Sequence, residues 1–192
     1  MYRIFPLSTE LIAAIIILLP IMFLYHTVVF HNVRKTLVYG IFTLYLAEIC
    51  VLVGFPNIIG IRIVLSFNIV PFLGILSDFR NSYLNILLFV PLGIFLPCLW
   101  QKYRTMKKTI LFGSATSLGI EVSQIFTMRA TDVNDLMTNV AGTVIGYLIG
   151  RVIIKKIPWL DSLKTKEGEL YLLCGTVIVV MFLIQPFILL QL

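Results

Sequence analysis

The sequence predicts an all-α membrane protein, a polytopic bundle of about five to six transmembrane helices. Hydrophobic residues make up 59% of its 192 residues and charged residues only 12%, whereas a soluble domain has about 25% charged residues. The mean hydropathy is +1.02. A bilayer core of about 30 Å is spanned by roughly 20 apolar residues, so the chain has room for these helices and little else. We therefore expect a single membrane domain over residues 1–192.

Six apolar runs of suitable length are the expected spans. They are Leu11–Phe30, Thr36–Phe55, Tyr83–Trp100, Thr109–Phe126, Asp135–Ile154 and Tyr171–Leu190. The first run is longer than the apolar part of a signal peptide and no small-residue cleavage site follows it, so we expect it to remain as a membrane anchor.

Residues 56–82, between the second and third spans, are apolar but irregular. Prolines and glycines interrupt this segment and polar residues are scattered through it: Pro56, Gly60, Arg62, Asn68, Pro71, Gly74, Asp78, Arg80 and Asn81. Irregular backbone is tolerated at membrane depth only where protein or water covers it. We expect an interfacial or re-entrant element here.

The basic residues predict the orientation. Eleven of the fifteen Lys and Arg residues fall in three loops that alternation places on one face: Arg34, Lys35, Lys102, Arg104, Lys107, Lys108, Arg151, Lys155, Lys156, Lys164 and Lys166. Cytoplasmic loops carry such an excess, so this face is expected to be cytoplasmic and both termini extracellular. The net charge of +6 then reflects membrane topology, and no nucleic-acid partner is expected. Lys155–Leu160 is expected to lie on anionic lipid as an amphipathic linker.

Polar and ionisable residues from separate segments gather toward the external side. Such groups are costly near hydrocarbon, so they usually face the bundle interior or a wet cavity and mark function. The expected ligand-binding residues are Asn68, Asn85, Glu121, Gln124, Arg129, Asp132, Asp135 and Asn139.

Helical spacing relates several of these residues. Ser117, Glu121 and Gln124 share one face of their helix, and Asp135 and Asn139 share a face with a stripe of small residues, Gly142, Gly146 and Gly150. Small residues spaced by four let another helix approach closely. The simplest packing sets this stripe against the span 109–126, which brings Asn139 and Asp135 near Gln124 and Glu121.

Two chemical interpretations remain open for Glu121. It is either a carboxylate with a raised pKa that transfers protons, with Arg129 and Asp132 as further catalytic candidates, or one member of a structural ion-pair network with them. Asp132 and Asp135 could face one cation, but Asp132 or Asn134 equally suits the N-cap of the following helix. We expect the cap, and therefore no metal and no cofactor.

These residues resemble the VanZ-like family of membrane proteins. The family couples an N-x-x-P-F lead-in and an N-x-x-x-F-x-P-x-G helix to E-x-x-Q, R-x-x-D-x-x-D and N-x-x-G-x-x-x-G. The chain matches with Asn68, Pro71, Phe72, Asn85, Phe89, Pro91, Gly93, Glu121, Gln124, Arg129, Asp132, Asp135, Asn139, Gly142 and Gly146. The resemblance covers about residues 68–150, and the span 171–190 is an addition to this core.

The resemblance implies a role against teicoplanin, a lipoglycopeptide that acts on peptidoglycan precursors at the outer face of the membrane. The first hypothesis is a non-catalytic envelope protein whose external polar pocket binds the drug or a lipid-linked precursor. The alternative is a membrane-embedded enzyme acting on an envelope lipid, with Glu121 as acid or base. A transporter is the weakest interpretation, since the chain is short and shows no inverted repeat. Membrane lipids are expected partners in every case.

Overall fold

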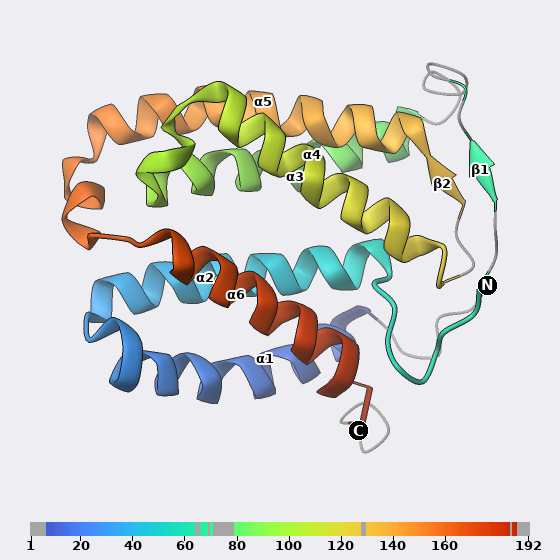
Figure 1. The fold of residues 1–192 in the computed structure, drawn as a ribbon, viewed down its shortest axis with the longest axis horizontal. Coiled ribbons are helices and arrows are strands. Elements are labelled where there is room, and N and C mark those ends of the chain that lie inside the picture. Colours follow the sequence, from blue (N-terminus) through green and yellow to red (C-terminus); the bar gives the residue numbers. More distant parts are fainter. Residues whose placement is uncertain are drawn as a thin grey trace. The chain divides into compact units, whose positions relative to one another are not determined.

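The computed structural model describes residues 7–63, 66–68, 70, 79–127, 130–184 and 186–187. The chain divides into two compact units: unit 1 comprises Met1–Arg62 and Gly168–Leu192, and unit 2 comprises Ile63–Glu167. The described residues are almost entirely helical, as Figure 1 shows, which confirms the all-α bundle.

Unit 1 consists of helices from both ends of the chain. Helix α1 (Leu7–Tyr25) continues into the π-helical turn η1 (His26–Phe30), and α2 (Val33–Val53) runs back along it. Helix α6 (Glu167–Val179) and its π-helical continuation η4 (Val180–Ile184) complete the unit. The α1–α2 connection is tight because His31 adopts a left-handed conformation (φ 49°) and the Asn32 side chain caps α2 by accepting from the Lys35 N–H.

A buried ion pair joins α2 to α6 inside unit 1. Lys35 Nζ lies 2.6 Å from Glu169 Oε1, and the Tyr39 hydroxyl donates to Glu169 Oε2 at 2.7 Å. Lys35 and Glu169 are 6% and 7% exposed, and the ammonium also lies near the rings of Phe30 and Tyr39. Lys35 is therefore an interior residue, although its sequence position suggested a surface loop charge.

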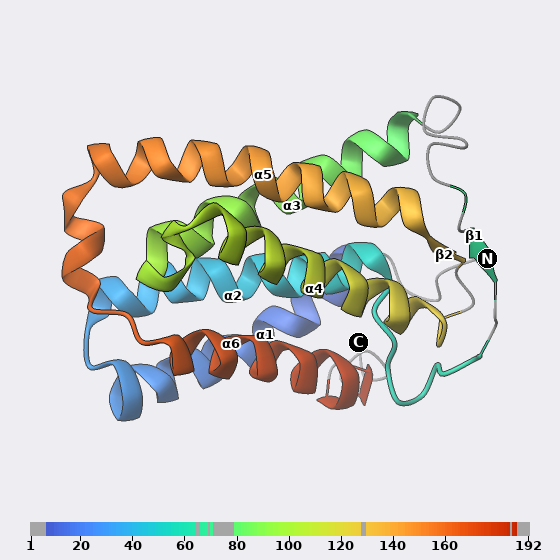
Figure 2. The same ribbon diagram turned by 45° about the horizontal axis from the view of Figure 1, so that its top comes forward.

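Unit 2 is built on three helices, α3 (Phe79–Leu99), α4 (Met106–Gln124) and α5 (Val133–Lys156). The 3₁₀ turns η2 (Gln101–Arg104) and η3 (Pro158–Leu163) follow α3 and α5. At the opposite end of α5, two-residue strands β1 (Phe67–Asn68) and β2 (Thr131–Asp132) pair in parallel. Figure 2 shows this pairing at the end of unit 2 where α5 begins.

The glycine stripe of α5 packs against α3, so the expected packing of this stripe against the span 109–126 is wrong. A Cβ atom on Gly146 would lie 2.9 Å from Gly93 Cα and closer still to the Val90 carbonyl oxygen. Gly142 meets the backbone of Ile86 in the same way. The stripe faces α3 because Gly93 there also lacks a side chain, which allows backbone to contact backbone. Helix α4 instead packs against α5 at Gly113, which faces the side chain of Thr143.

Five helices are long and apolar enough to cross a membrane: Thr9–Phe30, Val33–Val53, Phe79–Leu99, Val133–Lys156 and Glu167–Ile184. They identify a multi-pass membrane protein. The helix expected over 109–126 is present as α4, but its lysines and buried polar residues make it less apolar than these five. Of residues 56–82, the part 57–63 forms a loop with exposed isoleucines. Pro71, Gly74 and Asp78 lie outside the described residues.

Candidate functional site

Asp132 is the centre of a polar cluster at the start of α5. Its backbone N–H donates to Glu121 Oε2 at 2.9 Å. Its carboxylate accepts from the Asn134 N–H at 2.8 Å and from Asn68 Nδ2 at 3.0 Å. Through these bonds Asp132 joins β1, the end of α4 and the start of α5. The expected N-cap role of Asp132 is confirmed.

Thr131 adds a second set of contacts beside Asp132. Its N–H donates to the Ser66 carbonyl at 2.9 Å, and its hydroxyl donates to the Glu121 carbonyl at 3.1 Å. We call Asn68, Glu121, Thr131 and Asp132 the Asp132 cluster. Through these bonds β1, the end of α4 and the start of α5 hold one another in register.

Glu121 is buried in this cluster, with 2% of its surface exposed. Burial of a carboxylate is unfavourable unless hydrogen bonds compensate it, and the Asp132 N–H provides one such bond. Through this bond Glu121 ties the end of α4 to the segment directly before α5. Gln124, one turn further along α4, is also buried.

Asn139 lies deeper in the same α4–α5 interface. Its Nδ2 donates to the Ser117 hydroxyl at 2.9 Å, and the residue is only 4% exposed. Its Oδ1 is buried and accepts no hydrogen bond from any residue that the structure describes. A buried acceptor without a donor is destabilising by about 1–3 kcal/mol, and such atoms in native proteins call for an explanation.

The remaining expected site residues, apart from Gln124 and Asn139, do not belong to the Asp132 cluster or to the Asn139–Ser117 contact. Asp135 is half-buried in the first turn of α5. Asn85 is half-buried on α3, and the approach of Gly142 to the backbone of Ile86 sets it at the level of that turn of α5. Arg129 lies outside the described residues, as do Pro71 and Phe72 of the lead-in motif.

The structure adds residues that the motifs did not single out. Thr131 and the buried Asn134 lie between motif positions. Only their polar side chains, close to Asp132 in the sequence, could have identified them as part of the site. Among the described residues, no group of three or more His, Cys, Asp or Glu side chains is arranged to hold a metal ion. The site places the oxygens of Glu121, Asp132 and Asn139 at and near one end of the α4–α5 interface.

Comparisons with known proteins agree with the motifs. The family model described as VanZ/LLP1 matches residues 42–154, which extends the matched region from the quoted motifs back into α2. Protein VanZ of Enterococcus faecium is 31% identical over 118 residues, covering 58% of this chain and 72% of that protein. No solved structure matches the chain. The matched region includes the Asp132 cluster, Asn139 and the glycine stripe, and the chain belongs to the VanZ/LLP1 family.

Proposed function

We propose that this protein lowers the susceptibility of cells to lipoglycopeptide antibiotics such as teicoplanin. Polar side chains of α4 and α5 would bind the drug or a lipid-linked peptidoglycan precursor. Family membership and the similarity to Protein VanZ support the proposal. The observation that carries it is the buried Asn139 Oδ1, an acceptor without a donor among the described residues, one helical turn beyond Asp135.

An acceptor of this kind fits the chemistry of the proposed ligands. Glycopeptides and peptidoglycan precursors both carry amide N–H and hydroxyl donors. Departures from complete hydrogen bonding in native proteins are expected at functional sites. Because Asn139 Nδ2 donates to Ser117, the orientation of the amide is fixed, and under this proposal its buried oxygen would accept a hydrogen bond from a ligand donor.

The proposed orientation places this site at the outer face. Helix α5 has 24 residues, about 36 Å at 1.5 Å per residue. The Asp132 cluster lies at its N-cap, and Lys155 and Lys156 lie in its last turn. Since cytoplasmic ends are enriched in Lys and Arg, we place the lysine end in the cytoplasm, the cluster outside, and both chain termini outside.

The substitution Asn139→Leu tests the binding site. Leucine has a similar size and removes the unsatisfied oxygen, so we expect membrane abundance to be unchanged and teicoplanin protection to be lost. Teicoplanin and vancomycin susceptibilities would be measured in cells expressing wild type, Asn139→Leu and the matched control Asn81→Leu, where the asparagine is exposed, with protein amounts matched by immunoblot. Full protection by an equally abundant Asn139→Leu protein would refute the site. Absence of protection by the wild type would refute the proposed function itself.

Glu121→Gln separates this proposal from an enzymatic one. Glutamine keeps an acceptor for the Asp132 N–H but cannot act as a general acid or base. Because Glu121 positions the chain in the proposed mechanism, we expect Glu121→Gln to retain most of the protection, whereas Glu121→Ala, which leaves that N–H unpaired, should lose it. The same susceptibility assay measures both. Loss of protection by an abundant Glu121→Gln protein would favour the enzyme alternative.

A further inference from the structure

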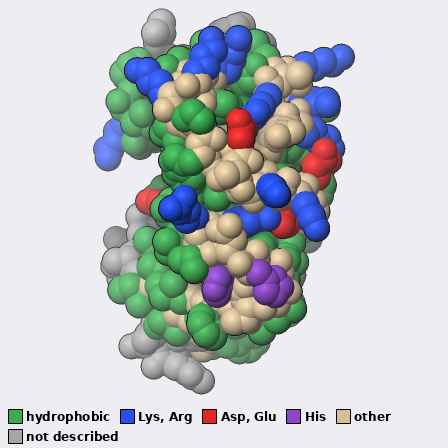
Figure 3. All heavy atoms as spheres, turned by 90° about the vertical axis from the view of Figure 1, so that its left-hand side faces the viewer, with side chains coloured by type: hydrophobic (Ala, Val, Ile, Leu, Met, Phe, Trp, Pro, Cys, Tyr) green, Lys and Arg blue, Asp and Glu red, His purple; other side chains and the backbone are tan. Residues whose placement is uncertain are grey.

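The end of unit 2 opposite the Asp132 cluster is a folded, strongly basic surface. Its exposed cations come from the start of α4 and the end of α5. We define the basic platform as five exposed cations: Lys107, Lys108, Arg151, Lys155 and Lys156. Figure 3 faces this end and shows Lys and Arg side chains gathered there.

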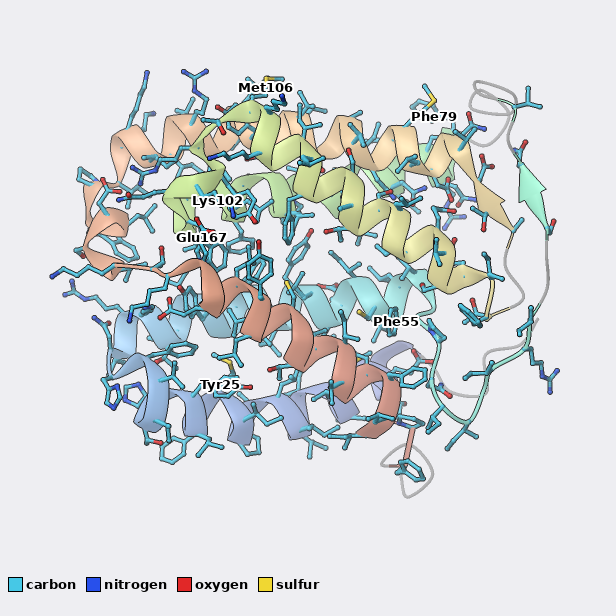
Figure 4. The ribbon with its side chains drawn as sticks, in the orientation of Figure 1. Tyr25, Phe55, Phe79, Lys102, Met106 and Glu167 are labelled. Carbon is cyan, nitrogen blue, oxygen red and sulfur yellow. The ribbon has the colours of Figure 1, made fainter. Side chains whose placement is uncertain are left out.

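The segments under the platform are fixed by specific contacts. Lys102 Nζ lies 2.6 Å from Glu167 Oε2, and Arg104 pairs with Asp161. Figure 4 labels Lys102 and Glu167, which lie close together. The Tyr147 hydroxyl donates to the Arg104 carbonyl at 2.8 Å. These bonds tie η2 to α5 and to the segment after it, so the platform is held on ordered backbone.

These ion pairs also occupy the nearby acids. Asp161 and Glu167 are bound to Arg104 and Lys102, and the five platform cations form no ion pair with any described residue. Arg151 lies 5.9 Å from the centroid of the Tyr147 ring. The platform therefore carries an excess of positive charge that no described side chain neutralises.

The surroundings of the platform are those of a bilayer interface. On α5 itself, Leu148 and Ile149 are exposed just before Arg151, and Val152 is exposed between Arg151 and Lys155. Trp159 of η3, which follows Lys156 after Ile157 and Pro158, is 44% exposed, whereas Trp100 is 1% exposed. Exposed tryptophan is enriched at the headgroup level of membranes. The exposed apolar residues beside the cations therefore favour a lipid surface over a soluble polyanion as the binding partner.

We propose that the basic platform binds the headgroups of anionic phospholipids. From Tyr147 to Lys156 the helix rises about 13 Å, and lysine side chains extend along apolar surface to reach phosphates, so the five cations can meet one headgroup layer. Each lysine near an anionic surface strengthens binding about fivefold. This interaction is independent of the proposed antibiotic role and involves the other end of the unit.

Quenching of Trp159 fluorescence by brominated lipids tests the proposal. The full chain would be reconstituted in vesicles in which either the phosphatidylglycerol or the phosphatidylcholine carries bromine, at equal mole fractions. Subtracting the signal of Trp159→Phe isolates Trp159 from Trp100. We expect stronger quenching by the brominated anionic lipid, and a several-fold smaller preference in Lys155→Gln/Lys156→Gln. Raising the ionic strength from about 0.1 to 1 M, which shortens the Debye length from ~10 to ~3 Å, should also reduce the preference.

The control variant Arg80→Gln removes a cation from the opposite end of α3 and should leave the preference intact. Circular dichroism and size-exclusion profiles would show that each variant is folded. Equal quenching by the two brominated lipids in the wild type would overturn the proposal. So would a preference that survives the double lysine substitution in folded protein, and Lys107→Gln/Lys108→Gln provides a second folded variant for the same comparison.

Discussion

Lys35→Met is expected to lower the free energy of unfolding by about 3–5 kcal/mol, the usual cost of removing one member of a buried ion pair. The substitution leaves the Glu169 carboxylate buried with the Tyr39 hydroxyl but without its cation. Methionine has nearly the shape of the lysine side chain, so the loss reports the charge and not the packing. Chemical denaturation in detergent micelles, followed by circular dichroism, measures it.

Lys102→Met is the matched control for this experiment. Lys102 and Glu167 are paired at the same distance, 2.6 Å, but their side chains are 34% and 51% exposed. Exposed pairs contribute about 0–1 kcal/mol, so this change should have little effect. The double substitution Lys35→Met/Glu169→Gln removes both buried charges and should recover most of the loss. Similar effects of Lys35→Met and Lys102→Met would contradict the buried pair.

Gly146→Leu is expected to destabilise unit 2 by about 3 kcal/mol or more, at or above the upper end of overpacking effects. Any side chain there meets the backbone of Val90 and Gly93 on α3, and backbone cannot move aside as a flexible side chain can. The α3–α5 interface would have to open. Denaturation of the purified variant in detergent, compared with wild type, measures the change.

Gly119→Leu is the control for the glycine substitution. Gly119 lies in the middle of α4, is exposed, and a Cβ atom there meets nothing within 4 Å. Replacing glycine in a helix by a better helix former is stabilising by up to about 1 kcal/mol, so this variant should be as stable as wild type or slightly more so. A loss in Gly119→Leu equal to that in Gly146→Leu would show that the effect is not specific to the α3–α5 contact.

The fold class was largely predictable from composition and the length of apolar runs, because the bilayer fixes how long a spanning helix must be. Helix partners were not predictable in the same way. A glycine stripe indicates close approach, yet its partner is chosen by which neighbouring helix also lacks side chains at that level, here Gly93 of α3. That matching depends on the three-dimensional register of two helices.

The Asp132 cluster was predictable in part. Motif spacing brought Glu121 and Asp132 together, and the structure joins them through the Asp132 backbone N–H. Motif spacing did not predict that Asn68 donates to the Asp132 carboxylate or that Asn139 donates to Ser117. The Lys35–Glu169 pair was not predictable from the sequence, because each residue lies at the end of an apolar run, where a charged side chain normally remains in water.

The Lys35–Glu169 pair has a consequence for biosynthesis. Its members are 134 residues apart, so at about 5–20 residues per second roughly 7–27 s pass between the synthesis of the lysine and that of its partner. During that interval the α1–α2 hairpin lacks the Glu169 carboxylate that binds the Lys35 ammonium in the folded unit. Unit 1 can therefore form its buried charge pair only after α6 has been synthesised, so the α1–α2 hairpin and α6 complete their packing late in translation.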